Sequence, residues 1–99
     1  MEESASREGP LIHALGLLPV GLDVVTAFAA DRPAGLLCGW VTQVSWDPPL
    51  IAVAVGRAKH THQAIVRSSA YAVNLLREEQ TAVARVFGTQ SGRDVDKFA

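Results

Sequence analysis

Residues 35–49 read GLLCGWVTQVSWDPP, and this stretch decides how the rest of the chain is interpreted. Its alternation predicts one long β-strand, but neither face of that strand is uniformly apolar. Trp, Thr and Gln side chains fall on both faces, which indicates that the strand lies against something other than its own core. Gly39 indicates a bulge, or a point where another backbone or a ligand comes close. Asp47, Pro48 and Pro49 end the strand, because proline cannot donate to a sheet.

Composition predicts a single soluble globular domain. The chain has 99 residues, 48% of them hydrophobic, and a formal charge of -1, so no basic excess suggests a nucleic-acid partner. No apolar run approaches the roughly 20 residues that a membrane helix needs. The one cysteine, Cys38, excludes an internal disulfide and favours a cytoplasmic protein. Residues 1–9 are polar, and we expect a disordered leader rather than a secretory signal.

The local patterns predict a mainly β protein with short helices, of the α+β class. Four strands are expected, over residues 22–30, 35–49, 50–55 and 71–76. Three helices are expected, over residues 10–18, 62–67 and 78–88. A turn over residues 31–34 would make the first two strands a hairpin, and the third strand is apolar enough to be buried on both faces. The last residues, 89–99, are expected to form a loop.

The ends and faces of the helices carry further expectations. Thr61 is the predicted N-cap of the second helix, which would turn Ile65 and Val66 inward. Glu78 and Glu79 are expected in the first turn of the third helix, where acidic side chains suit the helix dipole.

Five blocks of sequence occur in the order and spacing of the flavin reductase-like family. They are VGLDVVTA (20–27), GWVTQVSWDPPLIAVAV (39–55), KHTHQAI (59–65), YAVNLL (71–76) and SGRDVDKF (91–98). From about Leu15 onward the chain therefore resembles that family. Many members have Ser-Ser-Phe where this chain has Gly39, Trp40 and Val41, and in this respect it is most similar to the flavoredoxin-like members.

The resemblance implies the FMN-binding split β-barrel fold. Domains of the family usually continue well beyond the DKF sequence, so residues 10–99 are expected to be the N-terminal part of a single domain with an incomplete barrel. Four strands do not close a barrel, and an open barrel exposes strand edges.

The resemblance also implies an oxidoreductase that passes electrons from NADH or NADPH to or through a non-covalent flavin. FMN is the expected flavin, with FAD as the alternative. A homodimer with the flavin near its interface is expected, together with a redox partner protein. Because the cofactor carries the hydride chemistry, no catalytic residue of the chain is required. The alternative is a non-catalytic module that binds flavin or supports dimerisation.

Two groups of residues match the positions at which family members contact flavin. The first belongs to the central strand and comprises Leu37, Cys38, Gly39, Trp40, Val41, Thr42 and Gln43. The second belongs to the loop and helix start after the third strand and comprises Arg57, Lys59, His60, Thr61 and His62. The second group suits a phosphate, since a helix amino end supplies N–H donors and a favourable dipole. Gly39 would permit a flat ring to approach the backbone.

Each of these residues also has a structural explanation. Trp40 and Trp46 can be interface or core residues, and Cys38 a small packed side chain. His60 and His62 lack a third ligand at metal-binding spacing, so no metal site is expected. Lys59 and Arg57 can be surface charges. Two further features stay open. Asn74 can bond within the sheet or contact the flavin. Asp94, Asp96 and Lys97 can form an ordinary charged loop or a rim of the active site.

Overall fold

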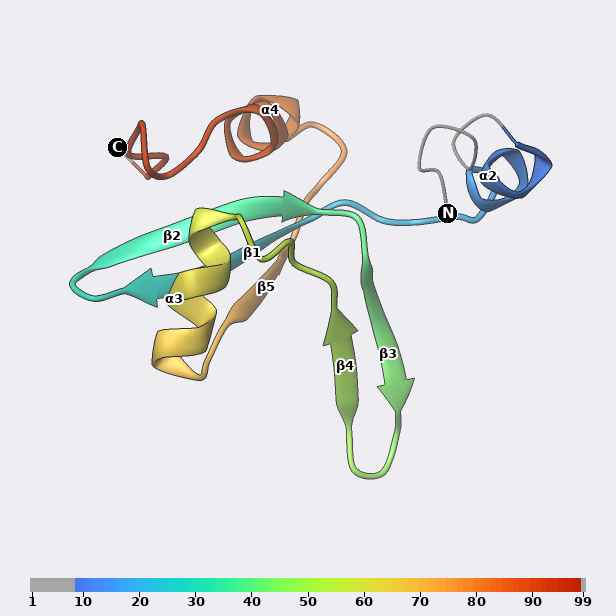
Figure 1. The fold of residues 1–99 in the computed structure, drawn as a ribbon, viewed down its shortest axis with the longest axis horizontal. Helices are drawn as coiled ribbons and strands as arrows, with labels where there is room; N and C mark the ends of the chain where they lie inside the picture. The colour runs from blue at the N-terminus through green and yellow to red at the C-terminus, as the bar shows by residue number, and fades with distance from the viewer. Residues whose placement is uncertain (1–8, 99) are drawn as a thin grey trace.

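The computed structural model describes residues 9–98, so most of the predicted leader lies outside the described residues. Its helices are α2 (Pro10–Leu15), α3 (His60–Ser68) and α4 (Thr81–Thr89) (Figure 1). Its strands are β1 (Asp23–Ala29), β2 (Arg32–Cys38), β3 (Val41–Ser45), β4 (Leu50–Val53) and β5 (Ala72–Leu75). The mainly β architecture with short helices agrees with the predicted class.

Three strands form an antiparallel sheet in the order β2-β1-β5, with β1 in the centre. Val25 of β1 lies opposite Leu36 of β2 and Val73 of β5. Its side chain is fully buried. Asn74 ties β5 to β1, because its amide donates to the Val24 carbonyl at 2.9 Å and to the Thr26 hydroxyl at 3.1 Å. Asn74 therefore forms the hydrogen bonds within the sheet that were one of its two predicted roles.

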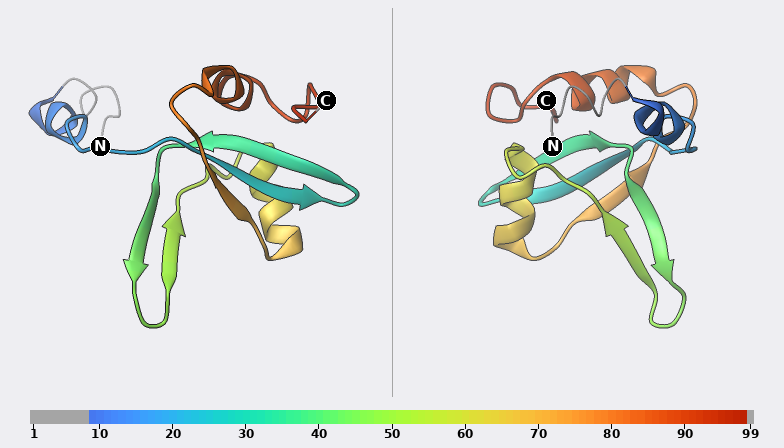
Figure 2. Two further views of the ribbon diagram at one scale, coloured as in Figure 1. Left: turned by 180° about the vertical axis from the view of Figure 1, so that it is seen from behind. Right: turned by 45° about the vertical axis from the view of Figure 1, so that its right-hand side comes forward.

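Helices α3 and α4 cover opposite faces of this sheet (Figure 2). Ala64 of α3 packs with Ala27 and Ala34 in a small core cluster. The next residue of β2, Gly35, faces the other way, where a Cβ atom would come within 2.7 Å of the Phe87 ring of α4. Successive residues of a strand point to opposite faces, so β2 is held between the two helices.

The long strand predicted over residues 35–49 is wrong, because the chain leaves the first sheet at Gly39 and Trp40. Strand β2 pairs with β1, whereas β3 pairs with β4 in a separate two-stranded ribbon that projects from the body (Figure 1). The backbone carbonyl oxygen of Gly21, which precedes β1, would lie 3.5 Å from a Cβ atom placed on Gly39. The approach of another backbone at Gly39 is thus observed. Alternation alone cannot detect a change of partner, since both segments stay extended.

Two other strand predictions also need correction. The turn of the first hairpin lies at Ala30 and Asp31, and Pro33 belongs to β2 rather than to the turn. Proline has no backbone N–H, and an edge strand tolerates it where that N–H would point to solvent and not to a neighbouring strand. Strand β4 is not buried on both faces, since Leu50 and Ile51 are about half exposed. Among the described residues, β4 has a sheet partner only in β3.

The helix boundaries differ from the predictions for local reasons. Lys59, not Thr61, is the N-cap of α3, and Thr61 is a buried residue inside the first turn. Ile65 packs against the core as predicted, but Val66 points outward. Burial of the Thr61 face sets the phase of the helix.

Helices α2 and α4 are also displaced from their predicted limits. Helix α2 ends at Leu15 and is shorter than predicted. Helix α4 starts at Thr81, after a turn in which the Arg77 N–H donates to the Gln80 side chain at 2.8 Å. Glu79 lies in that turn and pairs with Arg77, so the predicted acidic first turn of the helix is wrong.

The buried core is small for a chain of this length. Among the residues whose burial is described, six hydrophobic residues are buried, and three of them are alanines. They are Val24, Val25, Ala27, Ala34, Cys38 and Ala64. The radius of gyration is 15.2 Å, compared with about 13 Å for a compact chain of this length. The β3–β4 ribbon and α2 both extend away from the three-stranded sheet (Figure 1).

Candidate functional site

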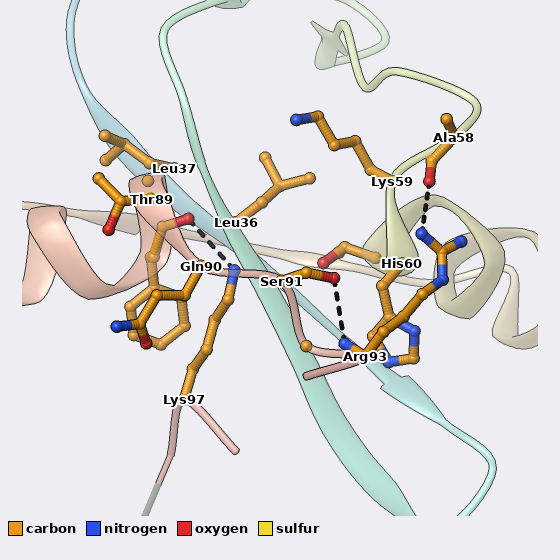
Figure 3. A pocket seen from close by; sticks show the side chains of 14 residues that line it. Leu36, Leu37, Ala58, Lys59, His60, Thr89, Gln90, Ser91, Arg93 and Lys97 are labelled. Atoms are coloured by element: carbon orange, nitrogen blue, oxygen red, sulfur yellow. Dashed lines mark hydrogen bonds between the residues drawn. The ribbon is translucent and has the colours of Figure 1, made fainter. Parts of the chain in front are cut away.

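A pocket of about 380 Å³ lies beside β2, between the start of α3 and the segment that follows α4 (Figure 3). This volume falls within the range of small-molecule sites. Side chains and backbone from three separate parts of the chain line the pocket. They are Leu36, Leu37, Ala58, Lys59, His60, Thr61, Phe87, Gly88, Thr89, Gln90, Ser91, Gly92, Arg93 and Lys97.

Close packing at two glycines shapes the pocket. A Cβ atom on Gly88 would come within 2.9 Å of the Leu37 side chain, which brings α4 against β2. A Cβ atom on Gly92 would come within 2.7 Å of the His60 ring, which brings the segment after α4 against the start of α3. These contacts join elements that are distant in sequence.

The pocket is basic, and carbonyl oxygens hold its cations in place. The Arg93 guanidinium donates to the Ala58 carbonyl at 2.8 Å. The Lys97 ammonium donates to the Gly35 carbonyl at 2.8 Å and to the Phe87 carbonyl at 3.2 Å. Within residues 9–98, no carboxylate lines the pocket and none forms an ion pair with either cation. Their positive charges are therefore not neutralised by the described residues.

Burial and the positive charges around the pocket lower the pKa of His60. Burial lowers the pKa of His60 from its usual 6.5, and the charges of Arg32, Arg93 and Lys97 lower this pKa further. Arg32 reaches the site from the start of β2, where it donates to the Gly92 carbonyl at 2.8 Å. The Nε2 atom of His60 is buried and has no hydrogen-bond partner among the described residues. A neutral imidazole is thus favoured in the absence of an anion.

Lys97 responds to the same environment. Burial lowers the pKa of Lys97 from its usual 10.5, and the charge of Lys59 lowers this pKa further. The Lys97 ammonium also lies 5.6 Å from the centre of the Phe87 ring, which offers a weak cation–π contact. A bound anion would relieve the repulsion between Lys97 and Lys59.

Four of the residues predicted to bind flavin line the pocket. They are Leu37, Lys59, His60 and Thr61. Thr61 is almost completely buried. Together these residues bring the end of β2 to the amino end of α3, where N–H groups and positive charge favour an anionic group.

The other predicted residues do not line this pocket. Arg57 is exposed in the preceding turn, and His62 is half buried on α3. Cys38 is buried, and its thiol lies 3.5 Å from the Ala54 carbonyl. Gly39 and Trp40 form the hinge between the two sheets, and Trp40 is 71% exposed. Val41, Thr42 and Gln43 belong to the projecting strand β3. The assignment of flavin contacts to these residues stays a prediction.

Sequence patterns do not assign Arg93 to the site, and they leave the role of Lys97 open. Both lie in the SGRDVDKF block, which resembles the family but reads as a charged loop. Its two basic residues are the feature that could indicate an anion site, but the two nearby aspartates make the block look like an ordinary charged loop. Only the folded chain shows that Asp94 and Asp96 are absent from the pocket lining.

Comparisons with known proteins agree with this fold. Residues 15–99 match the model of the flavin reductase like domain. Over 87% of its own length, the chain is 38% identical to a high molecular weight rubredoxin of Moorella thermoacetica. Over 78% of its own length, it is 37% identical to an NADH-dependent FMN reductase of Streptomyces nodosus. Flavoredoxin from Methanosarcina acetivorans superimposes on 82% of the chain with a TM-score of 0.78 and 25% identity.

The strands and helices thus place the chain among the split-barrel flavoproteins. More specifically, the chain belongs to the flavin reductase-like family. It spans 38% of the Moorella protein, 42% of the Streptomyces protein and 44% of the flavoredoxin chain, which is less than half of each. Within residues 9–98, every helix is too short or too polar to cross a membrane.

Proposed function

We propose that the chain forms the flavin-phosphate side of an NAD(P)H-dependent flavin reductase-like oxidoreductase. The observation that carries this proposal is the position of Lys59 and Thr61. Both match family positions that grip the flavin phosphate, and both line the basic pocket at the start of α3. FMN is the proposed cofactor, with FAD as the alternative, and NADH or NADPH is the proposed electron donor.

The residues of the pocket fit the phosphate end of a flavin. Lys59 supplies positive charge, the first turn of α3 supplies backbone N–H groups, and the described lining contains no carboxylate that would repel the ligand. Leu37 adds an apolar surface that leads toward Gly39, where the isoalloxazine ring is proposed to lie. When bound, FMN would supply the hydride and electron chemistry, and the chain would bind and orient it.

We also propose that the protein is a homodimer with the flavin near its interface. Several large apolar side chains of the β3–β4 ribbon and its turn are exposed, and these support the proposal: Val44 (58%), Trp46 (85%) and Ile51 (48%). A cytoplasmic location and electron transfer to a redox partner protein belong to the same proposal. A buried, unpaired Cys38 supports the location.

Substitution of Lys59 tests the flavin site. Lys59→Ala should weaken FMN binding by more than about tenfold, because it removes a charge-assisted contact to the phosphate. FMN is titrated into the protein, and its absorbance and fluorescence are followed. Arg67→Ala, on an exposed position of the last turn of α3, is the control and should leave the affinity unchanged.

Anaerobic addition of NADH then tests reduction. Bleaching of the bound flavin would support the reductase, whereas the absence of any FMN binding would favour the alternative function as a dimerisation module. An FMN affinity that is the same in Lys59→Ala and wild type would remove Lys59 from the site.

A further inference from the structure

Part of the basic pocket is built from the segment after α4, for which the sequence leaves open only a place at the rim of the active site. Figure 3 shows Arg93 beside His60, with its guanidinium directed toward Ala58 at the start of α3, whereas Lys97 lies on the opposite side of the pocket. Each of these two cations is anchored by carbonyl oxygens at hydrogen-bonding distance, so its position is fixed before any ligand arrives. Arg32 extends the arrangement through its bond to the Gly92 carbonyl.

Hydrogen-bond donors remain available after these anchors are formed. A guanidinium has five N–H groups and an ammonium has three. The side chain of Arg93 makes one hydrogen bond among the described residues, and that of Lys97 makes two. Arg93 therefore keeps most of its donors, and Lys97 keeps one. Lys59, which is exposed at the N-cap of α3, is the third cationic side chain of the pocket lining.

Like charges held together destabilise a fold unless a counter-charge is present. Here the carboxylates of the same segment, Asp94 and Asp96, do not line the pocket. Arg32, Arg93 and Lys97 act on His60 from β2 and from the segment after α4. An anion with two or more negative charges would neutralise this cluster, and the fork of an arginine suits the oxygens of a phosphate.

We propose that Arg93 and Lys97, acting with Lys59, bind a phosphoryl group that carries at least two negative charges. The proposal deepens the flavin-binding function and rests on it for the identity of the whole ligand. The phosphoryl group belongs to the flavin or to the nicotinamide cofactor. Lys97 has a second task, because its bonds to Gly35 and Phe87 hold the segment against β2 and α4.

Inorganic pyrophosphate is the probe, and the ring signals of His60 in NMR spectra are the readout. Binding should raise the pKa of His60, because the added negative charge offsets the cations that lower it. His13 on α2 does not line the pocket and serves as the internal reference. Arg93→Gln and Lys59→Gln should each weaken pyrophosphate binding by about tenfold, and Arg67→Gln should not.

Riboflavin, FMN and 2′,5′-ADP distinguish the two sources of the phosphoryl group. A preference for FMN over riboflavin that Arg93→Gln removes would assign the pocket to the flavin. Binding of 2′,5′-ADP that Arg93→Gln weakens, with equal affinity for FMN and riboflavin, would assign it to the nicotinamide cofactor. Both results support the proposal.

The proposal would be overturned if pyrophosphate left the pKa of His60 unchanged. It would also be overturned if pyrophosphate bound equally well to wild type, Arg93→Gln and Lys59→Gln. Lys59→Gln keeps this test valid even if Arg93→Gln disturbs the fold, because the side chain of Lys59 makes no hydrogen bond among the described residues. Failure of the flavin function would appear separately, as a lack of FMN binding while pyrophosphate still shifts His60.

Discussion

Gly35 is a residue at which β2 packs closely against α4. The Phe87 ring occupies the space that a side chain would need, and Phe98 packs edge-on against that ring with 5.2 Å between centroids. The ammonium of Lys97 bonds to the Gly35 carbonyl at the same point. A single absent side chain thus allows α4, the final segment and the sheet to meet.

Gly35→Ala should lower the free energy of unfolding by about 1–3 kcal/mol, because the new methyl group overpacks the contact with Phe87. The measurement is urea denaturation followed by circular dichroism. Gly21→Ala is the matched control, since a Cβ atom there would meet no other atom within 4 Å, and its effect should stay within about 0.5 kcal/mol. Equal stability of the two variants would contradict the packing argument.

Asn74 shows how one side chain can fit two explanations until its neighbours are known. Its position within an apolar segment requires hydrogen-bond partners if it is buried. In the fold, its amide bonds to Val24 and Thr26 of the adjacent strand, and it thereby fastens the edge strand β5 to the centre of the sheet. Sequence alone could not choose these partners, because they are about 50 residues away.

At the scale of elements, the β3–β4 ribbon differs from the three-stranded sheet. Its two strands pair with each other and with no further strand of the described chain. A register shift between Gln43 and Ser45 interrupts the pairing. Two-stranded ribbons are marginally stable without packing on at least one face, so the ribbon depends on contacts beyond its own hydrogen bonds.

We expect the amides of β3 and β4 to exchange with solvent roughly tenfold or more faster than those of β1 in dilute protein, because opening the ribbon exposes little buried surface. Native-state hydrogen exchange measured by NMR provides the test, and the central strand β1 is the internal reference. Equally slow exchange of ribbon and sheet at the lowest concentration would mean that the ribbon is packed within one copy of the chain.

The whole molecule buries few large side chains. Among the described residues, Val25 has the largest fully buried side chain, while Leu75, Trp40 and Trp46 are more than two-thirds exposed. Exposed apolar surface of this kind marks an interaction site. The chain also covers less than half of the relatives that it matches, so the fold described here corresponds to part of theirs.

Association of two copies through the ribbon is the corresponding prediction at this scale. Ile51→Lys should raise the dissociation constant of the dimer by about tenfold or more, because it would place an unpaired charge in an apolar interface. Sedimentation equilibrium measures the association. Gln63→Lys, at an exposed position of α3, adds the same charge elsewhere and should have little effect. A chain that stays monomeric at all concentrations would contradict the proposed dimer.

Local patterns predicted the main elements because propensity and periodicity act over a few residues. The first hairpin, the strand at β5 and the helix after Gly56 follow from such patterns, and the order of five sequence blocks led to the family. The limits of those elements were less accurate. Thr61 was predicted as a cap, yet its burial against the sheet fixed the helix in a different phase.

The sequence by itself determined the class of fold and the family, and it singled out Lys59, which lines the basic pocket. Only the tertiary structure decided that the chain changes sheets at Gly39, and that Arg93 and Lys97 line the same pocket as Lys59. The physical reason is the same in both cases. Strand pairing and charge convergence depend on contacts between residues tens of positions apart, and Lys97 reaches Gly35 only after β2, α4 and the final segment have packed together.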